Sequence, residues 1–254
     1  MDWSNYFFVA VLAFSLEVID GSFGMGYGTI LAPAMLMLGF DALRVVPAVI
    51  TSQLVGDFLV VFFHHQFKSV NMSVGSQHFK VGVMLAVFSL VGSVAAVLFA
   101  LNLSKFALNL YIGVLVVIAG VVVLVTRKET RDFSWLRLLF LGSIASFNKG
   151  LSGGGYGPIV TAGQVLTGVD ARAAIGITSL AEGVTCIAAV LTYAFSGTPI
   201  DWELSAALAV GVALSTPVAG FVVSKFQAKH LKLIIGVCTL LLGALTIFKT
   251  VRVL

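Results

Sequence analysis

Two glycine-rich segments carry the residues of this sequence that could bind a small charged molecule. One runs from Gly21 to Gly28 and the other from Gly150 to Gly157, and a short apolar stretch of about ten residues follows each. We expect these stretches to be half-helices that begin at Thr29 and Pro158. A helix start presents unpaired backbone N–H groups and the positive end of its dipole, and glycine lets a bound group approach closely. Two such starts that meet predict a cradle for an anion.

Polar residues in and around these segments are the candidate substrate contacts. Lys149 is the most informative, because an ionisable residue inside an apolar span is costly and is a functional candidate by default. It could pair with an anionic substrate, or with Asp20 or Glu182 as a structural ion pair. The expected substrate-binding set is Gly24, Gly26, Tyr27, Gly28, Thr29, Thr51, Ser52, Gln53, Asn148, Lys149, Ser152, Gly153, Gly154, Gly155, Tyr156, Thr178 and Ser179. Ser and Thr often bond their own helix, so only some of the hydroxyl residues should face a ligand.

Acidic residues near the same segments could carry a coupling ion. Asp20, Asp57 and Glu182 are expected to bind H⁺ or Na⁺, or else to face a polar cavity or pair with a base. Glu17 is expected in an outer vestibule, and His64 at a helix end is expected to be solvated. No group of His, Cys, Asp and Glu has the spacing of a metal site, so we expect no metal and no cofactor.

The composition is that of a helical membrane protein. Of the 254 residues, 59% are hydrophobic and only 10% are charged, against about 25% charged in an ordinary soluble domain. The mean hydropathy is +1.08. This excludes an ordinary soluble enzyme, a disordered chain and a disulfide scaffold. The net charge of +4 indicates membrane orientation rather than nucleic-acid binding, so the expected surroundings are a lipid bilayer.

The sequence predicts an all-α polytopic membrane protein built from two repeats. The repeats cover residues 1–125 and 135–254, and a cytoplasmic linker at 126–134 joins them. Each is expected to contain a broken or re-entrant helix pair, which is too short to span twice, followed by three transmembrane helices. The expected hairpins are 3–39 and 135–167, and the expected spans are about 42–63, 81–100, 106–125, 172–195, 204–224 and 231–249.

The repeats are visible as matching residues. Gly26-Tyr27-Gly28 matches Gly155-Tyr156-Gly157 at an offset of 129, and a slip of two residues aligns 51–56 with 178–183. A hairpin returns to the side from which it entered, and three further spans then end on the opposite side of the membrane. The second half must therefore be inverted relative to the first. With the linker in the cytoplasm, ten Lys and Arg lie on that side and four on the other, which predicts both termini outside. If 3–19 spans fully, the N-terminus could instead lie inside.

The glycine segments also resemble a known family. The stretches Phe147–Pro158 and Gly24–Pro33 resemble the motifs of the sulfite exporter TauE/SafE family, although Ala162 stands where a second proline would match Pro33. The resemblance implies a secondary transporter, not an enzyme, in the inner (cytoplasmic) membrane of a bacterium or archaeon. It would move sulfite, thiosulfate or an organosulfonate such as sulfoacetate, with coupling to an ion gradient. Inverted repeats with broken helices are typical of alternating access.

Other functions fit parts of the sequence. The acids could serve a cation carrier or channel. The stretch Gly150–Gly153 matches the GxSG motif of rhomboid intramembrane proteases through Ser152, but that chemistry needs a histidine base, and the predicted spans contain none. The glycines could also serve close helix packing alone.

Overall fold

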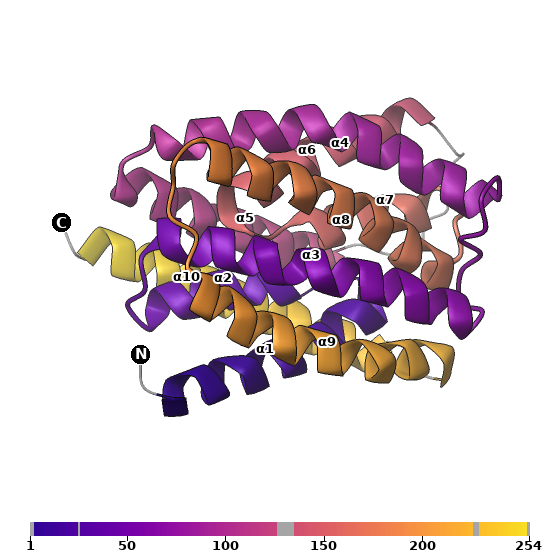
Figure 1. The fold of residues 1–254 in the computed structure, drawn as a ribbon, viewed down its shortest axis with the longest axis horizontal. Helices are drawn as coiled ribbons and strands as arrows, with labels where there is room; N and C mark the ends of the chain where they lie inside the picture. Colours follow the sequence, from indigo (N-terminus) through magenta and orange to yellow (C-terminus); the bar gives the residue numbers. More distant parts are fainter. Residues whose placement is uncertain (1–2, 25, 126–134, 226–228, 253–254) are drawn as a thin grey trace.

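The structure is a computed structural model that describes residues 3–24, 26–125, 135–225 and 229–252. All regular secondary structure in these ranges is α-helical (Figure 1). The helices are α1 (Trp3–Phe23), α2 (Tyr27–Met37), α3 (Ala42–Gln66), α4 (Gln77–Leu101), α5 (Lys105–Val125), α6 (Trp135–Ser152), α7 (Tyr156–Leu166), α8 (Ala171–Phe195), α9 (Trp202–Lys225) and α10 (Lys229–Arg252). The linker predicted at 126–134 lies outside the described residues.

Five of these helices are long and apolar enough to cross a bilayer. They contain the segments Tyr6–Phe23, Ala42–Gln66, Gln77–Leu101, Ala171–Phe195 and Trp202–Ser224. Large apolar side chains such as Phe7, Val91 and Phe221 are exposed on their outer faces, where lipid tails would cover them. The prediction of an all-α polytopic membrane protein is therefore confirmed.

Each glycine segment breaks a helix, and the following half-helix begins earlier than expected. The half-helices start at Tyr27 and Tyr156, two residues before Thr29 and Pro158, so those two predicted starts are wrong. Their N-caps are Gly26 and Gly155, with φ of 139° and 82°, which side chains rarely permit. Pro158 lies in the first turn of α7, where its missing N–H costs no hydrogen bond.

Contacts between helix ends show how the hairpins are placed. Tyr6 at the start of α1 donates to Glu203 at the start of α9 (2.5 Å), and Lys249 near the end of α10 donates to Leu36 O at the end of α2 (3.0 Å). The start of α1 and the end of α10 accordingly lie on the left in Figure 1.

The other hairpin is placed differently. The end of α7 leads into α8, whose first turns pack at Gly176 against Val70 of the α3–α4 loop. That loop lies on the right in Figure 1. The α1–α2 and α6–α7 hairpins thus open toward opposite ends of the helices.

Helix packing pairs the two halves of the chain. Numbered along each half, α1 to α5 correspond to α6 to α10. Helix α1 packs on α9, and the corresponding α6 packs on α4; α3 packs on α9, and the corresponding α8 packs on α4. Two corresponding pairs also pack directly on each other, namely α3 on α8 and α5 on α10. One apolar cluster joins α1, α2, α3 and α9, and a second joins their counterparts α6, α7, α8 and α4.

The two halves also share helix boundaries. Both bounds of α2 and α3 recur in α7 and α8 at an offset of 129, without a gap. The two-residue slip that we allowed for 51–56 and 178–183 is therefore wrong, because helices of equal length after loops of equal length leave no place for an insertion. In the structural register, Thr51 corresponds to Leu180, and Gln53 corresponds to Glu182.

Candidate functional site

Lys149 lies in the packed interior, on the last turn of α6. Its side chain is fully buried, and its Nζ donates to Glu182 Oε1 on α8 at 2.7 Å and to Gln53 Oε1 on α3. Of the two roles open for Lys149 in the sequence, the structure contains the ion pair with Glu182. Burial removes the hydration of a charged group, and this free-energy cost is offset only by a partner such as Glu182.

Gln53 extends this pair across the halves. Its Nε2 donates to Glu182 Oε1 at 3.1 Å and to Asp20 Oδ2 on α1 at 3.2 Å. Asp20, Gln53, Glu182 and Lys149 thus form one chain of hydrogen bonds, which we call the buried polar network. Asp20 corresponds to Lys149 and Gln53 to Glu182 at the offset of 129, so matching positions of the repeats carry different chemistry.

Asp57 lies beside this network on α3. It is buried, and Cys186 Sγ on α8 lies 3.7 Å from its Oδ2. These two residues are again 129 apart in sequence. The three acids expected to bind a coupling ion, Asp20, Asp57 and Glu182, therefore lie together around Lys149, as their place in the sequence alone could not show.

Two titratable residues lie elsewhere than expected. Glu17 is 1% exposed, so its placement in an outer vestibule is wrong: it sits on the face of α1 that packs against α3 and α9. His64 is also fully buried, and its Nε2 contacts Gly21 O at 2.8 Å, so its predicted solvation is wrong. Helix α3 continues to Gln66, beyond the predicted end at 63, and carries His64 into the packed interior.

The tips of the two hairpins touch each other through glycine backbone. A Cβ on Gly28 would lie 1.9 Å from Gly153 O, and a Cβ on Gly154 would lie 2.6 Å from Thr29 N. Gly155 N donates to Thr29 Oγ1 at 3.0 Å. The half-helix starts thus meet, as expected, but in this arrangement they pack on one another. An anion cradle between them stays a prediction that requires the tips to separate.

Several predicted site residues bond close to these tips. Tyr27 OH and Ser52 Oγ are 2.6 Å apart, and Tyr111 donates to Asn148 Oδ1 at 2.5 Å. Tyr156 OH lies 2.9 Å from Ser89 Oγ, and Thr178 accepts from Thr161 at 3.0 Å. Sequence reasoning missed four of these residues: Ser89 and Tyr111, which come from spans without a glycine signature, and Thr161 and Gln164, of which Gln164 also donates to Thr178 at 2.8 Å. Thr161 and Gln164 could have been found, since both lie on the half-helix that follows the second glycine segment.

Other predicted residues bond their own helices instead. Thr51 donates to Pro47 O at 2.7 Å, and Ser179 donates to Ile175 O at 3.1 Å. Ser152 donates to Asn148 O at 2.8 Å. Within the described residues no histidine hydrogen-bonds Ser152, so this arrangement holds no serine–histidine pair. The described residues also include no cluster of three or more His, Cys, Asp or Glu that could hold a metal ion.

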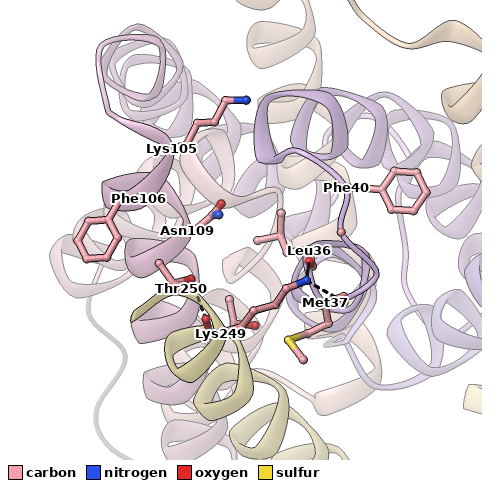
Figure 2. A pocket seen from close by; sticks show the side chains of 10 residues that line it. Leu36, Met37, Phe40, Lys105, Phe106, Asn109, Lys249 and Thr250 are labelled. Carbon is pink, nitrogen blue, oxygen red and sulfur yellow. Dashed lines mark hydrogen bonds between the residues drawn. The ribbon is translucent and has the colours of Figure 1, made fainter. Parts of the chain in front are cut away.

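A separate cavity of about 410 Å³ lies near the end of α2. Its lining includes Phe40, Lys105, Asn109 and Lys249, and Figure 2 shows Lys249 reaching toward the backbone of α2. There it donates to Leu36 O and Met37 O, both at 3.0 Å, and so caps the negative end of that half-helix.

Beside this cavity, Lys105 forms an ion pair with Asp41, the N-cap of α3. Partial burial raises the pKa of Asp41, but hydrogen bonds from Lys105 and from the backbone N–H of Leu43 outweigh that effect and leave the pKa lowered. Both lysines are thus engaged by the protein itself. We therefore assign this region to anchoring the first hairpin rather than to the central site.

Comparison with known proteins places this architecture. The model of the family described as sulfite exporter TauE/SafE matches residues 8–246. The chain belongs to that family. One curated relative, described as the probable membrane transporter protein YtnM of Bacillus subtilis (strain 168), is 25% identical over 252 residues. That alignment covers 91% of this chain and 79% of the relative. No solved structure matches the chain.

As a member of the TauE/SafE family, the protein is a multi-pass membrane transporter of the cell membrane. Its family match covers both glycine segments and the whole buried polar network. The resemblance noted in the glycine segments is therefore confirmed.

Proposed function

We propose that this TauE/SafE protein moves a small sulfur-containing anion, such as sulfite, thiosulfate or an organosulfonate, across the cytoplasmic membrane. Lys149 is the observation that carries the proposal. A fully buried ammonium at the meeting point of two broken helices is suited to bind an anion, and the carboxylate of Glu182 already occupies that position. The family description as a sulfite exporter supports the sulfur chemistry.

We further propose that substrate and Glu182 compete for Lys149. An arriving oxyanion takes the ammonium, and Glu182, displaced into a dry interior, takes a proton or a Na⁺ ion. Gln53 can follow this exchange because its amide bonds both Lys149 and Glu182. Anion and cation then move together. Asp20 and Asp57 are the further acids through which the coupling ion could pass.

We propose that transport proceeds by alternating access between two inverted repeats. The paired helix contacts, the shared bounds of α2 and α7, and the hairpins that open toward opposite ends support this relation. The burial of Lys149, Gln53, Asp57 and Glu182 corresponds to an occluded arrangement. Rocking one repeat against the other would separate the glycine tips and open the network to one side at a time.

A cation carrier is the second candidate, and the excess of acids around Lys149 favours it. Solute-driven currents from the purified protein in proteoliposomes separate the two. The solutes are sulfite, thiosulfate, sulfoacetate, taurine, sulfate and chloride, each tested with and without pH and Na⁺ gradients. A saturable response to a sulfur anion supports the proposal, and gradient dependence names the coupling ion. Responses to cations alone would favour the cation carrier. Electroneutral exchange produces no current, so uptake of isotope-labelled solute is measured as well.

A further inference from the structure

Glu17 is a buried acid with one oxygen that no group in the structure satisfies. It is 1% exposed, and its Oε2 is a buried atom without a hydrogen-bond partner. Its Oε1 lies 3.2 Å from the position of a Cβ on Gly56 and 3.9 Å from that of a Cβ on Gly21. The carboxyl group therefore rests on two glycines, at a point where Gly56 also packs against Val212 of α9.

Within the part of the chain that the structure describes, no cation bonds the Glu17 carboxyl group: His64 contacts Gly21 O through Nε2, and its Nδ1 is itself without a partner. Charged and titratable groups face Glu17 from each packed helix: Asp20 from α1, Tyr27 from α2, Asp57 and His64 from α3, Lys149 from α6 and Glu182 from α8. Helix α9 has no charged residue between Glu203 and Lys225. Lys149 is already held by Glu182 and Gln53. A buried charge without a partner is strongly disfavoured, so Glu17 must be neutral in this arrangement.

We infer that Glu17 is a proton-binding site of this transporter, protonated in the occluded arrangement and released when α1 parts from α3 and α9. The inference rests on the proposed function and adds to it the residue that carries the coupling proton. A proton fits this place better than Na⁺, because Oε1 rests on Gly21 and Gly56 and Oε2 has no hydrogen-bond partner, so no set of oxygen ligands for a Na⁺ ion converges on the carboxyl group. One turn along α1, Asp20 bonds Gln53, so a movement of α1 reaches the buried polar network directly.

The first test needs no substrate. Infrared spectra of the full-length protein in lipid vesicles record the C=O stretch of a protonated carboxylic acid and its shift in D₂O. Glu17→Gln should remove one such band, and Glu203→Gln, the matched change at an exposed glutamate, should retain it. If the Glu17→Gln spectrum keeps every protonated-acid band of the wild type, Glu17 is ionised and the inference fails.

The second test measures coupling in proteoliposomes with isotope-labelled sulfite, or with thiosulfate if sulfite is not carried. With one proton per anion, a gradient of one pH unit supports about tenfold accumulation in the wild type. Glu17→Gln should exchange labelled for unlabelled anion but lose this accumulation, whereas Glu17→Asp and Glu203→Gln should keep it. Undiminished accumulation by Glu17→Gln would refute the inference.

The two tests keep the inference separate from the proposed function. If the wild type carries no sulfur anion, the proposed function fails, while the infrared band still decides whether Glu17 binds a proton. If the Glu17→Gln variant neither exchanges nor accumulates the labelled anion, the infrared band of the protonated acid decides whether Glu17 binds a proton. Its loss in correctly folded protein supports the inference, and its persistence overturns it.

Discussion

Gln53 Nε2 donates a hydrogen bond to Glu182 Oε1 in the protein interior, at 3.1 Å, although 129 residues separate the two in sequence. The same offset relates α2 to α7 and α3 to α8. Asp57 and Cys186, which are also 129 residues apart, meet in the same way. Both pairs join α3 to α8, and Lys149 bonds both members of the first pair.

Variants of the ion pair between Lys149 and Glu182 can distinguish a role in substrate binding from a role in stability. Lys149→Ala should abolish uptake and also lower the free energy of unfolding by about 3–5 kcal/mol, because it leaves Glu182 buried without a partner. Lys149→Met combined with Glu182→Gln should recover most of that stability but not uptake. Thermal unfolding in detergent and anion uptake measure the two effects.

Lys105→Ala is the control for that pair, since it removes an exposed lysine paired with Asp41. A surface pair contributes at most about 1 kcal/mol, so uptake and unfolding should both stay close to wild type. Equal losses of uptake in Lys105→Ala and Lys149→Ala would contradict the assignment of Lys149 to the binding site.

The contact between the hairpin tips should not tolerate a side chain. Gly154→Leu should block substrate binding and uptake, and Gly28→Ala should also impair folding, because its Cβ would lie 1.9 Å from Gly153 O. Gly142→Ala in α6 is the matched control, since its Cβ would meet only the flexible end of Leu85 at 3.1 Å and Ser89 Oγ at 3.7 Å. Purified yield, unfolding temperature and equilibrium anion binding report the difference. Normal binding by folded Gly154→Leu would refute the cradle.

The cap on α2 makes Lys249 more important for stability than its place near the chain end suggests. Lys249→Ala removes charged hydrogen bonds to Leu36 O and Met37 O, which should cost about 1.5–3 kcal/mol. Lys249→Arg should restore part of this. Denaturant or thermal unfolding of both variants, with Lys105→Ala beside them, tests the assignment. A Lys249→Ala protein as stable as Lys105→Ala would show that the cap is not needed.

Membrane topology can be tested with single cysteines in a variant without the two native ones. Val74 lies exposed in the α3–α4 loop, and Thr198 lies in the α8–α9 loop at the other end. With both termini outside, a membrane-impermeant maleimide added to intact cells should label Thr198→Cys. It should label Val74→Cys only after the cells are opened. The reverse pattern would place the N-terminus in the cytoplasm.

The sequence by itself determined the fold class and the location of the breaks. Apolar spans of bilayer length can be satisfied only as helices, since lipid offers the backbone no hydrogen bonds. Paired glycine segments, each before a short apolar run, sufficed to identify two broken helices and the family. The sequence did not determine where the half-helices start: they begin at Tyr27 and Tyr156, because Gly26 and Gly155 supply the positive φ.

Only the tertiary structure decided which polar residues meet. Lys149 could pair with Asp20, Glu182 or a substrate until the packing of α3 on α8 placed Gln53 and Glu182 within reach of its ammonium. Glu17 and His64 looked peripheral because they stand near the ends of apolar runs, yet both are buried. A hydrophobic pattern reports how far a helix extends. The side-chain contacts of its polar residues depend on neighbours that lie over a hundred residues away in the sequence.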